Sequence, residues 1–263
     1  MKTRIITALN ASGVLAGLLL LWQTMICILR IPPFMLPSPF AVARTVVAHF
    51  PSLAGSFFIT ATAAAGGLIA SIAAGVVIAL MFAKSTWLRR MFLPYTILLQ
   101  TVPIVAVAPL IIMWVGAGLF AVTLITFIIC LAPIIANTTQ GLISVDENMV
   151  NLFIMQNASA AQILWKLRLP HALPAIFTGV RIASGISVIG AITGELFAGS
   201  SSVGQGGLGY SITYALAQLQ TDYLFALVFA ATILVFLFFF IVMFLEYYFL
   251  HSWHESARVV ESH

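Results

Sequence analysis

The sequence predicts an all-α integral membrane protein with six transmembrane helices. Hydrophobic residues make up 62% of the 263 residues and charged residues only 7%, whereas a soluble domain carries about 25% charged residues. Apolar stretches near the roughly 20 residues that cross a bilayer recur along the chain. Their length favours helices, because the strands of membrane barrels are shorter and alternate in polarity. Too few polar side chains are present to cover a surface in water.

Six apolar stretches define the expected spans. The region between Arg90 and Asp146 carries no charged residue and is too long for one helix, so we place a turn at the Val-Gly-Ala-Gly sequence of residues 115–118. Pro103 and Pro109 are expected to break or kink the span before that turn. The first span lacks the features of a cleaved signal peptide and is expected to be retained. The expected spans cover residues 11–29, 55–83, 92–114, 119–135, 172–196 and 223–245.

The distribution of lysine and arginine predicts the orientation in the membrane. With the N-terminus inside, eight basic residues fall in inner segments, two fall in outer loops, and Arg181 lies within the fifth span. Cytoplasmic loops carry the excess of positive charge, so both termini are expected to be cytoplasmic, as segments 1–10 and 251–263 around a transmembrane domain of residues 11–250. The net charge of +4 is then explained by the basic residues of the cytoplasmic segments, and no nucleic-acid partner is expected. The inner residues are Lys2, Arg4, Lys84, Arg89, Arg90, Lys166, Arg168 and Arg258, and the outer ones are Arg30 and Arg44.

The longest inner connection, residues 136–171, has the pattern of short amphipathic helices. Apolar residues recur at three- and four-residue spacing between Met149 and Leu167. Asn157 interrupts the pattern, and asparagine adopts the left-handed backbone more readily than most other residues with a side chain. Ser159 is expected to cap the helix that follows. From the residues alone, the loop is either a helix on the membrane surface or a docking segment.

A few polar residues within the spans are candidates for a solute path. Ionisable residues in a span usually face a cavity or a partner. Arg181 either reaches the inner headgroups or lines the path, and Glu195 either gates the outer mouth or bonds to a neighbouring loop. The two residues lie about 21 Å apart along one helix, too far to pair. Ser184 and Ser187 contribute either to helix packing or to the path. Gln100 either lines the path or makes a polar contact between helices.

The inner loop resembles the cytoplasmic motif of permease subunits of bacterial ABC importers, in the branch for nitrate, sulfonates, taurine and pyrimidine or flavin vitamins. That motif is approximated by E-A-A-x-x-x-G, about nine residues, then I-x-L-P, and here it reads NLFIMQNASAAQILWKLRLPHALP. Asn157 stands at the family glycine, and Asn151, Leu152 and Phe153 replace Glu-Ala-Ala. Further matches along nearly the whole chain are LPSPFAV, LLQTVPIVAVAPLIIMWVG, NTTQG, GELFAG and GLG.

The resemblance implies a type I ABC importer-like permease in the bacterial inner membrane. It further implies a second permease copy, two ATPase subunits and an external solute-binding protein. The Gly/Ser-rich outer segment after Glu195 is either the docking site of that binding protein or a flexible connector. The implied ATPase-coupling residues are Glu147, Asn151, Leu152, Phe153, Ile154, Asn157, Ala158 and Ser159. The candidate translocation residues are Gln100, Pro103, Arg181, Ser184, Ser187 and Glu195.

The chain is expected to be a transport subunit without enzymatic activity. It contains no G-x-x-x-x-G-K-[ST] sequence, so ATP and magnesium are expected on a separate subunit. Cys27 and Cys130 lack metal-ligand spacing, and His251 and His254 lack a further ligand nearby, so no metal or cofactor is expected. The alternative is a stand-alone secondary transporter or channel, which usually carries more buried ionisable groups or an internal repeat.

Overall fold

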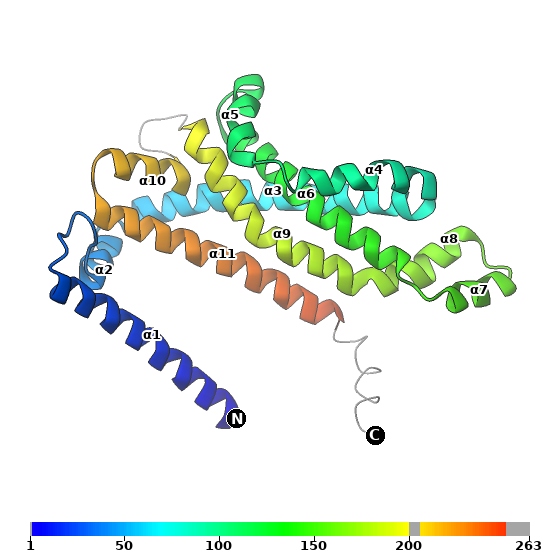
Figure 1. The fold of residues 1–263 in the computed structure, drawn as a ribbon, viewed down its shortest axis with the longest axis horizontal. Helices are drawn as coiled ribbons and strands as arrows, with labels where there is room; N and C mark the ends of the chain where they lie inside the picture. Colours follow the sequence, from blue (N-terminus) through cyan, green and yellow to red (C-terminus); the bar gives the residue numbers. More distant parts are fainter. Residues whose placement is uncertain (1, 200–205, 251–263) are drawn as a thin grey trace.

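The computed structural model describes residues 2–199 and 206–250, and every element in these ranges is helical. Most of the long helices lie side by side along one direction, the N-terminal helix diverges from them, and short helices lie at both ends (Figure 1). The helices are α1 (Lys2–Leu29), α2 (Pro39–Ala48), α3 (Phe50–Lys84), α4 (Thr86–Leu99), α5 (Ile104–Val115), α6 (Leu119–Ile143), α7 (Glu147–Met155), α8 (Ala160–Ile163), a π-helix η1 (Leu164–Arg168), α9 (Leu169–Ala198), α10 (Leu208–Ala217) and α11 (Thr221–Leu250).

The helical membrane fold is confirmed, and the residues that the structure describes contain four or five of the six expected spans. Four helices are long and apolar enough to cross a membrane, namely α3, α6, α11 and the continuous stretch Ala160–Ala198. The pair α4 and α5 makes a fifth span if the two are counted together. The apolar part of α1 among the described residues, Gly17–Leu29, is shorter than a full span. Six spans and the cytoplasmic position of both termini therefore remain predictions.

The third expected span is broken. Helices α4 and α5 meet at 99°, with the break at residues 100–103. Pro103 is the N-cap of α5. The Gln100 and Thr101 amides donate to the Ile97 and Leu98 carbonyls, three residues back, so the last turn of α4 is tighter than an α-helical turn. A proline has no amide hydrogen to continue the helix. The predicted break is thus confirmed at Pro103, whereas α5 continues through Pro109.

The core of the fold is a close packing of α3, α6 and α9. Thr126 of α6 lies between two glycines, Gly67 of α3 and Gly190 of α9. A Cβ atom on Gly67 would stand 2.5 Å from the Thr126 Cβ, and one on Gly190 would stand 3.2 Å from the Thr126 Cα. Small residues at helix crossings permit this backbone approach, which supplies the van der Waals packing that joins helices in lipid. The small-residue pattern of the fifth span therefore has a packing role at Gly190.

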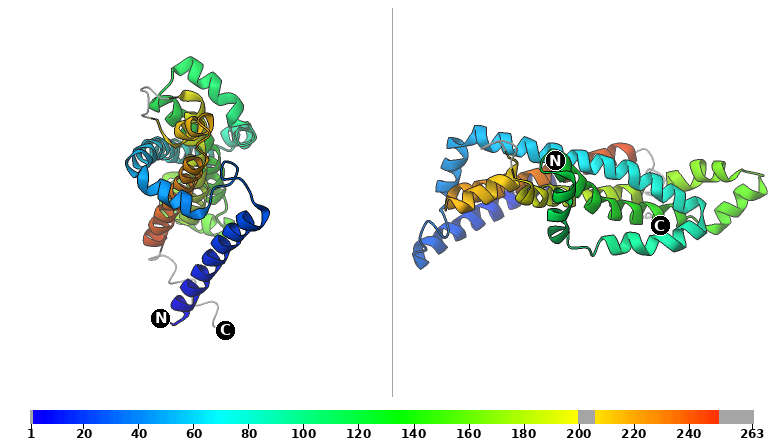
Figure 2. Two further views of the ribbon diagram at one scale, coloured as in Figure 1. Left: turned by 90° about the vertical axis from the view of Figure 1, so that its left-hand side faces the viewer. Right: turned by 90° about the horizontal axis from the view of Figure 1, so that it is seen from above.

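The two ends of the bundle differ in charge. One end carries α7, α8 and the α3–α4 junction, and the other carries α2 and α10 (Figures 1 and 2). Lys84 and Arg89 flank the α3–α4 junction, and Arg168 from the loop donates from Nη1 to the Ala83 carbonyl at 3.4 Å. We call this end the basic end. Since positive residues collect on the cytoplasmic side, it is the end expected to face the cytoplasm.

The opposite end is held together by polar contacts between short and long helices. Thr45 of α2 donates to Asp222 of α11 at 2.7 Å, and Ser56 of α3 shares a 2.8 Å hydrogen bond with Ser211 of α10. The sequence patterns did not predict α2 or α10 as separate helices. Part of the Gly/Ser-rich segment, residues 200–205, and the tail with His251 and His254 lie outside the described residues.

Candidate functional site

The inner loop contains the short amphipathic helices that its sequence predicts. Helix α6 continues to Ile143, so the loop begins eight residues later than the predicted boundary at residue 136. Asp146 is the N-cap of α7 and accepts from the Asn148 amide at 2.7 Å. Glu147 lies in the first turn, where a carboxylate is favoured by the helix dipole. The acidic pair thus fixes where α7 starts.

The turn after α7 has the left-handed backbone expected at Asn157. Its φ is 57°, and the Ala158 amide donates back to the Phe153 carbonyl at 3.0 Å. Such a backbone costs most side chains about 1–2 kcal/mol, and asparagine is among the few residues that adopt it routinely. Asn157 therefore replaces a glycine with the turn intact.

Ser159 caps α8 as predicted. Its hydroxyl oxygen accepts from the Gln162 amide at 3.3 Å, and the Gln162 side chain accepts from the Ser159 amide at 2.7 Å. This reciprocal capping box satisfies two amides that the first helical turn would leave unpaired. The turn and the cap together set the angle between α7 and α8.

Helix α7 exposes apolar side chains and buries none. Leu152 is 55% exposed, Ile154 56% and Met155 81%, while Phe153 and Ala158 are half-buried. Glu147, Asn151, Asn157 and Ser159 are exposed as well. All the residues proposed for ATPase coupling thus lie together on one projecting segment at the basic end, as Figure 1 shows. Their coupling role stays a prediction.

The loop is anchored to the bundle through η1. Leu164 is buried with Ala79 of α3, Leu142 of α6 and Ala172 of α9. From α8 the chain passes through η1 into α9 without a break. A pocket of about 540 Å³ lies between the loop and the end of α3, lined by Lys84, Ile154 and Arg168 among others. The segment α7–α8 is therefore attached to the bundle through the buried Leu164, and a pocket separates part of it from the end of α3.

The residues predicted for the translocation path fall into two groups. Gln100 and Pro103 are exposed at the break between α4 and α5. Ser184 and Ser187 are fully buried in α9, where their hydroxyls donate to the carbonyls of Arg181 and Ser184 at 2.8 Å. Within one chain these serines pack between helices, and a role in the path stays a prediction.

Arg181 forms an ion pair that the sequence did not predict. Its Nη2 contacts both carboxylate oxygens of Glu246 on α11, with 37% of the Arg181 side chain and 19% of the Glu246 side chain exposed. An unpaired arginine or aspartate at the centre of a membrane helix costs about 2.5–3.5 kcal/mol on the insertion scale. Glu246 lies 65 positions after Arg181 in the chain, so no local sequence spacing could predict the pairing.

Glu195 is buried at the N-terminus of α10. Its Oε2 accepts from the Thr60 hydroxyl at 2.9 Å and from the Gly209 amide at 2.8 Å. Thr60 also accepts from the Leu208 amide at 2.7 Å. A Cβ atom on Gly207 would collide with the Glu195 carboxylate, so glycine permits this approach. Glu195 thus bonds to a neighbouring segment, one of the two predicted alternatives, and a gating role stays a prediction.

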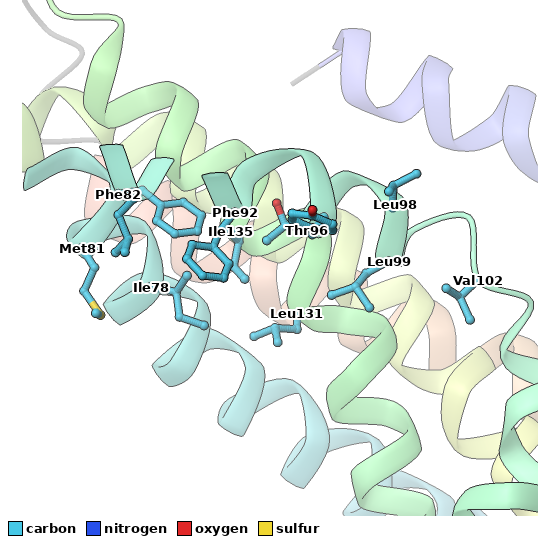
Figure 3. Close-up of a pocket in the computed structure, with 12 residues that line it drawn as sticks. Ile78, Met81, Phe82, Phe92, Thr96, Leu98, Leu99, Val102, Leu131 and Ile135 are labelled. Carbon is cyan, nitrogen blue, oxygen red and sulfur yellow. The ribbon is translucent and has the colours of Figure 1, made fainter. Parts of the chain in front are cut away.

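An apolar groove of about 680 Å³ runs between α3, α4 and α6 (Figure 3). Phe82 of α3, Phe92 and Leu99 of α4 and Ile135 of α6 are among its lining residues. Its lining has no charged side chain among the residues that the structure describes. Nor do the described ranges contain a group of three His, Cys, Asp or Glu residues placed to hold a metal. The groove therefore offers mainly apolar contact.

Comparison with known proteins assigns the fold to a family. Residues 71–253 match the model of the binding-protein-dependent transport system inner membrane component. The chain is 33% identical over 86% of its length to a "Probable ABC transporter permease protein" of Haemophilus influenzae, of which it covers 89%. It is 33% identical over 83% of its length to the riboflavin transport system permease protein RibX of Chloroflexus aurantiacus, covering 80%. It is 31% identical over 77% of its length to the formylaminopyrimidine transport permease protein ThiX of Halalkalibacterium halodurans, covering 79%.

These relatives are transport subunits, which agrees with a multi-pass helical protein of the inner membrane and leaves the stand-alone transporter without support. An importer of this family works with an ATPase and a substrate-binding protein. The chain belongs to the family of inner-membrane components of binding-protein-dependent transport systems, and it is a permease subunit of an ABC importer.

Proposed function

We propose that α7 and the turn at Asn157 form the seat of a separate ATPase subunit, which binds and hydrolyses ATP with magnesium. The observation that carries this proposal is the projection of α7 from the basic end with Leu152, Ile154 and Met155 exposed. Apolar side chains on a charged, water-facing end are typical of a surface that a protein partner covers. The continuous path from α8 through η1 into α9 then carries a displacement of α7 into the membrane.

The assembly that we propose contains two copies of this permease, two ATPase subunits and an external solute-binding protein. The α2–α10 end, with its polar contacts between Thr45 and Asp222 and between Ser56 and Ser211, faces the binding protein. The solute is a small organic or inorganic anion or a vitamin precursor. This class follows the names of the relatives, which include riboflavin, formylaminopyrimidine and taurine permeases.

Purification from native membranes in mild detergent tests this proposal. We expect an ATPase subunit to co-purify in stoichiometric amount and the sample to hydrolyse ATP. Addition of the binding protein with riboflavin, taurine, nitrate or formylaminopyrimidine as probes is expected to stimulate hydrolysis with one solute class. A preparation of this chain alone, inactive towards ATP in native lipid, would contradict the proposal.

A further inference from the structure

Two partly buried charged residues, one on α9 and one on α11, carry an inference about how motion spreads from the ATPase seat. We propose that Arg181 and Glu246 are positioning residues, which clasp α11 to α9 so that both helices move as one unit during transport. The inference rests on the proposed function, because it takes α9 as the helix that α7 drives. It assigns to Arg181 a partner within the chain in place of contact with the solute.

The first support is the geometry of the ion pair. Arg181 directs one guanidinium nitrogen at both oxygens of Glu246, so the two charges neutralise each other. Both residues belong to long apolar helices, α9 and α11, where an ionisable side chain without a partner is costly. Separating α9 from α11 at this level would therefore leave two unpaired charges facing lipid or a path.

A second contact lies one helical turn away on both helices. The rings of Phe177 and Phe249 stack with centroids 6.1 Å apart and an interplanar angle of 28°. Phe177 precedes Arg181 by four residues and Phe249 follows Glu246 by three, so both pairs lie on one antiparallel seam. An aromatic stack adds shape to the charge pairing. We call these four residues the α9–α11 clasp.

The clasp occupies the part of α9 nearest to the loop. Arg181 lies twelve residues from Leu169, where η1 passes directly into α9, and that separation is about 18 Å along the helix. Towards the other end, Val188 and Ala191 of α9 belong to the same buried cluster as Leu227 and Leu234 of α11. Asp222, at the far end of α11, bonds to Thr45 of α2. A rigid α9–α11 pair thus connects the ATPase seat to the end that faces the binding protein.

The test replaces the ion pair by an apolar pair and then restores the link covalently. In a background with Cys27→Ala and Cys130→Ala, Arg181→Met with Glu246→Met removes both charges without leaving either alone. The complex with its co-purified ATPase is expected to assemble in normal amount, with ATP hydrolysis reduced about three- to tenfold, the size expected for lost coupling through packed elements. Adding Phe177→Cys and Phe249→Cys and joining them with a short thiol cross-linker is expected to restore hydrolysis.

Three results would overturn the clasp: normal hydrolysis in the two-methionine variant, failure of the cross-link to restore it, or loss of hydrolysis when the same cross-link is made with Arg181 and Glu246 intact. If the two-methionine variant does not assemble, the charge-reversed pair Arg181→Glu with Glu246→Arg takes its place. The clasp requires that pair to recover the hydrolysis that each single reversal loses.

A failure of the proposed function is visible separately, as absence of the ATPase subunit from the unaltered preparation. In that case the clasp is still tested on the permease alone. Each single charge reversal is then expected to lower the apparent melting temperature, and the double reversal to restore it. An unchanged melting temperature in both single variants would contradict the pairing.

Discussion

Ala158→Arg is expected to abolish ATP-driven transport while the permease still inserts into the membrane in normal amount. Ala158 is half-buried in the turn after α7, and its amide bonds to the Phe153 carbonyl at 3.0 Å. A guanidinium at this position would be buried without a partner against the ATPase. An unpaired buried charge at an interface costs about 2–5 kcal/mol or more, which corresponds to a loss of affinity of roughly thirtyfold or more. Co-purified ATPase and ATP hydrolysis per permease measure the effect.

Two matched variants separate charge, size and position in this experiment. Ala158→Ser keeps the side chain small and neutral, and it is expected to retain the ATPase. Thr86→Arg adds the same charge at an exposed site on the same end of the bundle, at the start of α4 and outside the loop. If Ala158→Arg retains full hydrolysis, or if Thr86→Arg loses as much, the seat does not lie at the turn after α7.

Glu195→Ala is expected to destabilise the protein by loosening α10 from α3 and α9. The substitution removes the acceptor of the buried Gly209 amide. It also removes one of the two acceptors of the Thr60 hydroxyl, whose other acceptor is the Ser56 carbonyl at 3.1 Å. Leaving a buried donor without an acceptor costs about 1–3 kcal/mol. Thermal unfolding in detergent should therefore show a lower midpoint for Glu195→Ala than for the unaltered chain.

Glu195→Gln is the matched control, since its amide oxygen still accepts hydrogen bonds at nearly the same place. It is expected to unfold closer to the unaltered protein than Glu195→Ala does. Thr60→Val gives an independent check, because it deprives the Leu208 amide of its acceptor while leaving the Glu195–Gly209 bond in place. Equal midpoints for the alanine variant and the unaltered chain would show that the carboxylate does not hold α10.

Local signals predicted much of the fold. The span predicted at residues 119–135 starts where α6 starts. The turn predicted at residues 115–118 lies where α5 ends, at Val115, and residues 116–118 separate it from α6. Asn157 has the expected positive φ, and Ser159 makes the expected cap. Each of these features depends on backbone preferences or hydrogen bonds within a few residues, and such preferences are visible in sequence. The third expected span consists of two helices at 99°. Its hydropathy is continuous and does not show the bend, which occurs at Pro103.

Contacts between distant segments could not be predicted from the sequence. Arg181 and Glu246 pair across 65 residues, and Thr60 and Glu195 pair across 135. Which face of each helix meets its neighbour depends on packing, and hydropathy carries little of that information when every face is apolar. For the same reason the burial of Ser184 and Ser187 followed only from the packing of α9 against its neighbours.

Site-specific photo-cross-linking can locate the ATPase subunit on α7. A photoreactive residue is placed at Met155 on α7, which is 81% exposed, and in a second sample at Leu219 near the opposite end, which is 82% exposed. The two sites have equal access to solvent and differ in the end of the bundle that they occupy, as Figure 1 shows for the elements around them. We expect a cross-link to the ATPase from residue 155 and none from residue 219. An ATPase cross-link from residue 219, or none from residue 155 in a complex that hydrolyses ATP, would contradict this placement.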